Sequence, residues 1–342
     1  METVLTQAAT HSTFHVGELS EIAAARRAAA EMARRLKFDE TRAGRLAIVV
    51  TEAATNIVKH AVEGEILMRP VNVDGHCGVE VIAIDSGPGM ASIDAFMADG
   101  TSTAGTYGVG MGAIRRQSDS FDIYSAPGKG TVVMMVIWRV DGPVPQTGWE
   151  TGAVCLPIPG EDECGDTWGV SYRRGGLSVV VADGLGHGPE AAVASTASVD
   201  VSLDFAKGSP GARLEDAHAA LRATRGAAVA IADIDCYTGK LVFAGVGNIA
   251  ASIVSNGPRR HLLSHNGIVG SNLRKVQEFE QPWDSSSLLI LATDGINTRW
   301  DLAPYPGLSF NHASVIAAVL YRDFQRGRDD ATVVVVREHA AP

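Results

Sequence analysis

The sequence predicts an α+β protein of two domains. A length of 342 residues exceeds what a single core of ordinary size holds. Helix-forming segments come early, whereas strand follows strand between residues 227 and 263. Between these regions, the segment VDGPVPQTGWETG at 140–152 is rich in proline and glycine, which indicates a linker. We therefore expect a first domain at 1–140, a linker at 141–150 and a second domain at 151–342.

Charge and composition exclude several classes of protein. The formal net charge is −10 without a long basic run, which argues against nucleic acid and anionic membranes as partners. The apolar run TVVMMVIW has the length of a strand and is too short to span a bilayer. The N-terminus lacks the basic segment and apolar core of a signal peptide. The four cysteines form no C-x-x-C pair, so we expect free thiols in a cytoplasmic protein.

The first domain is predicted to begin with a strand, a loop and two helices. Residues 1–17 favour the strand and loop, and residues 18–37 are rich in the helix formers Ala, Arg, Glu and Leu. Asp39 is placed to cap a second helix that ends near Val62. On that helix, apolar residues recur at spacings of three and four and predict a stripe facing the core: Leu46, Val50, Ala53, Ile57 and Ala61.

A separate face of the second helix carries Glu52 and Asn56, one turn apart. Taken alone, the pair is more simply interpreted as a solvated stripe. The next segments favour a site, because the strand VEVIAIDSGPGM ends at Asp85 and is followed by Gly87 and Gly89. A run of glycines then precedes a third helix, and such a run lets backbone N–H groups approach phosphates. These glycines are Gly105, Gly108, Gly110 and Gly112.

The ordered set Glu52-x-x-x-Asn56, Asp85-x-Gly87-x-Gly89, Gly108-x-Gly110-x-Gly112 and Gly130-Thr131 resembles the GHKL ATPases. Within that group, residues 10–140 resemble the RsbT/RsbW-type switch kinases. The resemblance implies an α/β sandwich, with a mixed sheet covered by helices, and an ATP site that includes these glycines.

The resemblance also implies individual roles. Asn56 would coordinate Mg²⁺, and Asp85 would accept a hydrogen bond from the adenine amino group with help from Thr131. The Gly108–Gly112 loop would lie against the phosphates. Glu52 would be the general base that takes the proton from a substrate hydroxyl.

The second domain is organised around LSVVVADGLGHGPEAAVAST at 177–196. An apolar run ends at Asp183 and Gly184, glycines surround His187, and Pro189 opens an Ala-rich helix. A buried strand would thus deliver one carboxylate and a backbone carbonyl to a rim. Both are hard oxygen donors that suit Mg²⁺ or Mn²⁺.

Other aspartates stand at the ends of strand-like runs, namely Asp166, Asp294, and the adjacent Asp329 and Asp330. A single aspartate of this kind is usually a turn former. The joint pattern over residues 150–338 resembles the SpoIIE/RsbX-type branch of the metal-dependent PPM serine/threonine phosphatases. The resemblance implies a β-sandwich flanked by helices and two Mn²⁺ or Mg²⁺ ions. The implied ligands are Asp166, Asp183, the Gly184 carbonyl, Asp294 and, of the adjacent pair, Asp329.

In such a site the ions would lower the pKa of a bridging water for in-line attack on phosphorus. His187 would either donate a proton to the leaving group or shape the loop. The motif GVGN at 245–248 also resembles the phosphatase family, although the motif taken by itself is better explained as a hairpin turn.

Together the two resemblances imply a bifunctional regulator of a partner-switching pathway of the stressosome or sigma-factor type. The first domain would phosphorylate Ser or Thr on a STAS-domain partner, and the second would dephosphorylate such a partner. Alternatively, the first domain binds ATP only to capture a partner, as an anti-sigma-type module, and the phosphatase is the only enzyme. A scaffold inactive in both halves is disfavoured by the near-complete set of acids.

Overall fold

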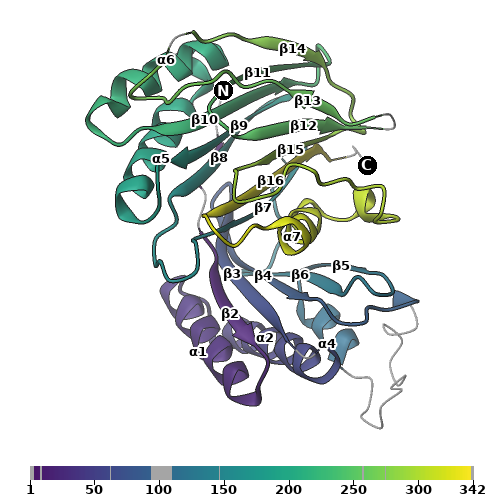
Figure 1. Ribbon diagram of the computed structural model, residues 1–342. Coiled ribbons are helices and arrows are strands. Elements are labelled where there is room, and N and C mark those ends of the chain that lie inside the picture. Colours follow the sequence, from purple (N-terminus) through teal and green to yellow (C-terminus); the bar gives the residue numbers. More distant parts are fainter. Residues whose placement is uncertain are drawn as a thin grey trace. The chain divides into compact units, whose positions relative to one another are not determined.

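Figure 1 shows the computed structural model, which describes residues 4–7, 10–61, 63–93, 110–145, 147–255, 258–273 and 275–339. The chain forms two compact units, and neither is contiguous in sequence. The single-sheet unit comprises His11–Pro145 and Leu302–Arg322. The sandwich unit comprises Met1–Thr10, Gln146–Asp301 and Asp323–Pro342.

The single-sheet unit contains a five-stranded sheet in the order β2-β3-β4-β6-β5. All of its pairings are antiparallel, so the sheet is not mixed as the resemblance had implied. The long β3–β4 hairpin turns at Asp74 and Gly75, both with positive φ, as a tight hairpin turn requires. The strands are β2 (Ser12–Val16), β3 (Gly64–Val73), β4 (His76–Asp85), β5 (Ser120–Ser125) and β6 (Thr131–Trp138).

Two long helices, α1 (Leu19–Arg35) and α2 (Glu40–His60), cover one face of this sheet, with the short α4 (Gly110–Gln117) beside α2 (Figure 1). The predicted cap is confirmed, because the Asp39 carboxylate accepts a hydrogen bond of 2.7 Å from the Arg42 N–H. The predicted apolar stripe of α2 is buried against the sheet, where Leu46, Val50 and Ile57 pack with Val81 and Met135. Burying such side chains stabilises the fold by about 2 kcal/mol each.

The opposite face of the same sheet is also buried. Leu67 and Ile82 are fully buried there, and Ile84 and Met134 are nearly so. Strand residues alternate between faces, so these side chains point away from α1 and α2. A segment from late in the sequence hydrogen-bonds to this second face. It contains a 3-10 turn (Leu308–Phe310) and most of helix α7 (Ala313–Phe324).

The sandwich unit packs a six-stranded sheet, β1-β8-β9-β10-β11-β14, against a five-stranded sheet, β13-β12-β15-β16-β7. Trp168, Val179 and Phe243 of the first sheet share one core with Leu291 and Val334 of the second. The first sheet contains β1 (Val4–Gln7), β8 (Asp166–Arg173), β9 (Gly176–Gly184), β10 (Ala227–Asp235), β11 (Lys240–Val246) and β14 (Phe279–Pro282). The second contains β7 (Trp149–Leu156), β12 (Ala250–Val254), β13 (Arg260–Leu262), β15 (Leu288–Ala292) and β16 (Ala331–Glu338).

Helices α5 (Pro189–Ser202) and α6 (Pro210–Ala220) lie on the outer face of the six-stranded sheet (Figure 1). Short 3-10 turns follow them at Phe205–Lys207 and Leu221–Ala223. Along the parts of the chain that the structure describes, none of the helices combines the length and apolarity needed to cross a bilayer.

The two units exchange segments relative to the contiguous domains expected at 1–140 and 151–342. Strand β1 pairs with β8 from Val4↔Tyr172 to Gln7↔Gly169, so the first strand belongs to the sandwich. Residues 302–322 belong to the single-sheet unit, although the expected second domain contains them. The sequence at 313–324 carries no information about which sheet the helix α7 joins.

Candidate functional sites

Strand ends bring the acids of the sandwich unit to one rim. Asp166 on β8 and Asp183 on β9 are direct cross-strand partners. Asp294 follows β15, and Asp329 precedes β16. Asp183, Asp294 and Asp329 line one cavity of about 390 Å³, together with Asn248 and Asn266. Residues separated by more than a hundred positions therefore meet at this cavity.

The acids of this rim raise one another's pKa. Burial, followed by the charges of Asp294, Asp329 and Asp330, raises the pKa of Asp183 to about 8. Burial and the charge of Asp183 raise the pKa of Asp166 well above its usual range. Burial and Asp329 also raise the pKa of Asp294, and Arg326 offsets only part of that effect. A divalent cation would relieve this repulsion.

The donor set suits a hard cation, because it consists of carboxylates and the Gly184 carbonyl. However, no three His, Cys, Asp or Glu side chains in the described residues form a group able to hold an ion as they stand. Asp330 is otherwise engaged, since its oxygens accept hydrogen bonds from the N–H groups of Ile158 at 2.7 Å and Gly165 at 2.8 Å.

Two neighbours of these acids were not assigned to the site from sequence. Asn248 donates a hydrogen bond of 2.6 Å from Nδ2 to Oδ2 of Asp294, so the GVGN motif is more than a turn. Thr293 donates from Oγ1 to Oδ2 of Asp166 at 2.7 Å. The signal for Asn248 was the motif itself, whereas Thr293 had only its position directly before Asp294.

The loop after β9 depends on its glycines. A Cβ on Gly184 would lie 2.1 Å from the carbonyl oxygen of Ala191, so any side chain there would push α5 away. His187 lies in the same loop, and its Nδ1 is 2.8 Å from Oε1 of Glu161. That contact ties the loop to the segment before β8, in keeping with the loop-shaping role.

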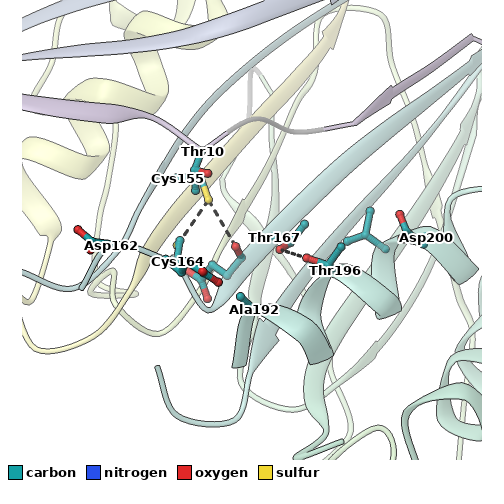
Figure 2. A pocket seen from close by; sticks show the side chains of 11 residues that line it. Thr10, Cys155, Asp162, Cys164, Thr167, Ala192, Thr196 and Asp200 are labelled. Atoms are coloured by element: carbon teal, nitrogen blue, oxygen red, sulfur yellow. Dashed lines mark hydrogen bonds between the residues drawn. The ribbon is translucent and has the colours of Figure 1, made fainter. Parts of the chain in front are cut away.

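A second cavity of about 280 Å³ lies beside Asp166, and Figure 2 shows its lining. Cys155 and Cys164 face each other there with 3.7 Å between their sulfur atoms. Cys155 also donates to the Asp166 carbonyl at 3.7 Å. The contact with Cys155 and burial raise the pKa of the Cys164 thiol far above its usual value. All four cysteines of the chain are free thiols.

In the single-sheet unit, Glu52 and Asn56 of α2 lie beside the first residue of α4. A Cβ added to Gly110 would lie 3.1 Å from Oδ1 of Asn56 and 3.3 Å from Oε2 of Glu52. The glycine therefore lets α4 begin directly against the acid and the amide. Gly112 lies in the first turn of the same helix. Gly105 and Gly108 fall outside the described residues.

Asp85 ends β4 directly opposite Thr131 of β6. Its Oδ1 accepts hydrogen bonds from the N–H groups of Gly87 at 2.8 Å and Thr131 at 3.1 Å. Burial raises the pKa of Asp85, although these two N–H groups and the charge of Arg322 oppose that rise. A Cβ on Gly87 would lie 2.9 Å from Cα of Ala61, which places this turn at the end of α2.

Gly89 and Gly130 both have positive φ and pack against backbone. A Cβ on Gly89 would lie 2.0 Å from the Ala126 carbonyl oxygen, so a side chain does not fit. Arg322, from α7, donates a hydrogen bond of 3.1 Å to the Asp85 carbonyl. No pattern around Arg322 in the sequence predicted this contact.

Comparison with known proteins gives a family match for each of the two resemblances noted in the sequence. Residues 16–137 match the family "Histidine kinase-like ATPase domain", and residues 173–339 match "Stage II sporulation protein E (SpoIIE)". The serine/threonine-protein kinase RsbT of Bacillus subtilis (strain 168) is 35% identical over 118 residues, which are 34% of this chain and 89% of RsbT. The chain belongs to the family of histidine kinase-like ATPase domains through residues 16–137, and its later part is similar to SpoIIE.

A second relative is a phosphatase by name. The phosphoserine phosphatase RsbX of Bacillus subtilis (strain 168) is 27% identical over 139 residues, covering 40% of this chain and 70% of RsbX. A solved chain from "The bacterial stressosome: a modular system that has been adapted to control secondary messenger signaling" is 29% identical with a TM-score of 0.52, and covers 55% of this chain and 99% of that chain.

A crystal structure of RsbX in complex with magnesium is 22% identical with a TM-score of 0.50, and covers 56% of this chain and 96% of that chain. At this identity the likeness concerns the fold alone. The predicted α+β fold class, with a helix-covered sheet and a β-sandwich flanked by helices, is confirmed.

Proposed function

We propose that this chain is a bifunctional regulator of a partner-switching pathway. Its ATPase-like domain transfers phosphate from ATP to Ser or Thr of a STAS-domain partner, and its SpoIIE domain removes phosphate from such a partner. RsbT is a serine/threonine kinase and RsbX a phosphoserine phosphatase by name, which supports the pairing of opposing activities. One polypeptide would then fix the ratio of the two activities.

The observation that supports a phosphatase activity is the rim of mutually repelling aspartates around one cavity. Asp183, Asp294 and Asp329, with Asp166 and the Gly184 carbonyl, would hold Mn²⁺ or Mg²⁺. Bound ions would supply an activated water and neutralise the phosphate oxygens. Asn248 would keep the Asp294 carboxylate oriented through its hydrogen bond. The two amides in the cavity lining, Asn248 and Asn266, offer donors to a phosphoester.

The proposal of kinase activity rests on the close approach of Gly110 to Asn56 and Glu52. Asn56 would hold the Mg²⁺ that accompanies ATP, and the N-terminus of α4 would face the phosphates. Asp85 would accept the adenine amino hydrogen bond beside Thr131, with Gly87 and Gly89 in the turn that follows Asp85. Glu52 would accept the proton of the attacking hydroxyl, because a carboxylate near the phosphate end is placed for that transfer.

One preparation of the full chain tests both activities. Labelled ATP with Mg²⁺ and a purified STAS-domain protein should yield a labelled partner, and Mn²⁺ with that phosphorylated partner should release phosphate. Glu52→Ala should abolish transfer but not release. If wild-type protein binds ATP and releases phosphate but transfers none, the first domain is instead the partner-capture module.

A further inference from the structure

Two apolar side chains share a cavity with the acids of the rim. Leu185 and Ile268 line the cavity of the three aspartates described above, within the sandwich unit. Leu185 is 51% exposed, and Ile268 is half-buried. A single exposed leucine is ordinary on a protein surface. Leu185 differs because it lies beside the acids, where a phosphoester would have to bind. We call Leu185 and Ile268 the apolar seat.

A buried glycine between the two loops brings the apolar seat together. The Leu185 N–H donates a hydrogen bond of 3.0 Å to the Gly226 carbonyl. A Cβ added to Gly226 would lie 2.7 Å from Cγ2 of Ile268, so Ile268 packs directly on this glycine. Gly226 has a φ of +86°, a conformation that favours glycine. Leu185 and Ile268 therefore both lie against the same glycine.

The sheet fixes the positions of both loops. Ile268 exchanges two backbone hydrogen bonds with Asn272, of 3.1 and 3.0 Å. The next residue, Val269, exchanges two with Ala227, of 3.0 and 2.9 Å, and Ala227 is the first residue of β10. Leu185 directly follows the last residue of β9. The apolar seat is therefore held by the ends of two paired strands, which suits a preformed binding surface.

The rest of the lining carries little charge. Apart from the three aspartates, the described lining of the cavity consists of glycine, alanine, two amides and the apolar seat. Arg225 approaches the loop, since a Cβ added to Gly186 would lie 3.1 Å from its Nη1, but its guanidinium forms an ion pair with Glu190. Bound divalent ions would neutralise the aspartates. The cavity then offers contact to an aliphatic side chain and no partner for a charged one.

We propose that Leu185 and Ile268 determine substrate specificity by binding an aliphatic side chain next to the phosphorylated Ser or Thr. This rests on the phosphatase activity of the proposed function. A substrate that brings its phosphoryl group to the rim places the neighbouring residues against the rest of the lining. Removing an aliphatic side chain from water against the apolar seat stabilises the bound substrate. The two residues touch none of the reacting atoms.

The test uses phosphoserine peptides that differ only in the two residues flanking the phosphoserine, which are both Leu, Gly, Asp or Lys. Phosphate release by the full chain with Mn²⁺ gives kcat and KM for each peptide. Wild type should prefer the Leu peptide to the Gly peptide by about tenfold in kcat/KM, the lower end of the discrimination that an apolar pocket gives. The difference should lie in KM. The Asp and Lys peptides should be no better than the Gly peptide.

Variants of the exposed leucine sharpen the test. Leu185→Ala should reduce the preference for the Leu peptide to about threefold or less, because part of the apolar contact is lost. Leu185→Lys should reverse the order of the Leu and Asp peptides, since an ammonium would pair with the flanking carboxylates. Val193→Ala is the matched control, because Val193 is 61% exposed on α5 and stands outside the described lining of the cavity. This control should keep the wild-type preference.

The outcomes separate the apolar seat from the phosphatase activity. If wild type releases no phosphate from any peptide with Mn²⁺, the proposed phosphatase activity is wrong and the apolar seat falls with it. If wild type hydrolyses the peptides but treats Leu and Gly alike, or prefers Asp or Lys, the apolar seat is wrong and the phosphatase activity stands. An unchanged preference in Leu185→Ala, or an equal loss in Val193→Ala, would also overturn the apolar seat.

Discussion

The rim of the sandwich unit and the proposed nucleotide site of the single-sheet unit both place an aspartate at the end of a buried strand, just before a glycine-containing turn. At Asp85, two backbone N–H groups and Arg322 surround the acid with positive or donating groups. At Asp183, the neighbours that affect its pKa are three further aspartates, which raise it after burial has done so.

The difference teaches that the same sequence pattern can produce two different electrostatic surroundings. An acid whose charge is offset in part by N–H donors and a cation can recognise a neutral donor, such as an amino group. An acid surrounded by other acids needs a cation before it is stable in its charged form. The identity of the neighbours, which come from distant segments, decides between these uses.

The largest expected effect is at the unbalanced acid. Asp183→Asn should reduce Mn²⁺-dependent hydrolysis of para-nitrophenyl phosphate by about 1,000-fold, or about 4 kcal/mol of activation free energy, because it removes a proposed ligand shared by the rim. Steady-state kinetics will measure the effect, with the exposed Asp284→Asn as control. Turnover within threefold of wild type would remove Asp183 from the metal site.

Replacing the balanced acid should act on binding instead. Asp85→Asn should weaken ADP binding by about 30-fold, because a charge-assisted hydrogen bond contributes about 2 kcal/mol. Fluorescent ADP titration measures the change. Asp74→Asn is a matched control, since Asp74 is exposed at the β3–β4 turn with positive φ, which asparagine tolerates. Equal affinities of Asp85→Asn and wild type would contradict the assignment.

A third acid, Glu80, is buried and balanced but has no place in either site. Burial alone would raise the pKa of Glu80, but Arg69 and His11 outweigh it and hold the pKa well below the ordinary value of 4.5. Glu80→Gln should lower the free energy of unfolding at pH 7 by about 2 kcal/mol through loss of charge-assisted bonds.

The pH dependence has a definite sign. Because the folded-state pKa of Glu80 is depressed, its contribution is present above the ordinary value of 4.5 and is lost as pH falls toward the folded value. Urea unfolding of wild type and Glu80→Gln should therefore differ most at neutral pH, and the difference should begin to shrink below the ordinary pKa of 4.5 and continue to shrink as the pH falls further. A constant difference across that range would mean that the charge of Glu80 contributes nothing.

The smallest expected effect is at an outer residue of the rim. Asn248→Ala removes the donor to Asp294 and should reduce Mn²⁺-dependent hydrolysis by about 10-fold, the usual minimum for loss of a group that orients a metal ligand. The difference in hydrolysis rate between wild type and Asn248→Ala should become smaller when the Mn²⁺ concentration is raised. Asn266→Ala, another amide of the same cavity, provides the comparison, and an equal loss there would argue against a specific role for Asn248.

The sequence predicted what depends on local chemistry. Neighbours within a few residues were enough to predict the Asp39 cap and the apolar stripe on α2. The same holds for the strand ends at Asp183 and Asp294 and for the glycines at helix starts. The family resemblance predicted that Asp166 and Asp183 lie close together, and the strand register places them directly opposite each other.

What could not be predicted depends on which surfaces meet. A four-residue strand such as β1 fits the edge of either sheet, and the apolar helix α7 fits any buried face. Their places were decided by the open edge of β8 and by Glu80, Asp122 and Asp85, none of which is near them in sequence. Arg322 and Asn248 likewise contact their aspartates only because segments distant in the sequence pack together.

The central claim is that the aspartates of the rim hold divalent ions. Loss of the electron paramagnetic resonance signal of free Mn²⁺ on titration with the full chain measures that directly. The account predicts two bound ions per chain in wild type and a loss of binding in Asp294→Asn, while fluorescent ADP binding with Mg²⁺ persists in that variant. Equal Mn²⁺ binding by wild type and Asp294→Asn would contradict it.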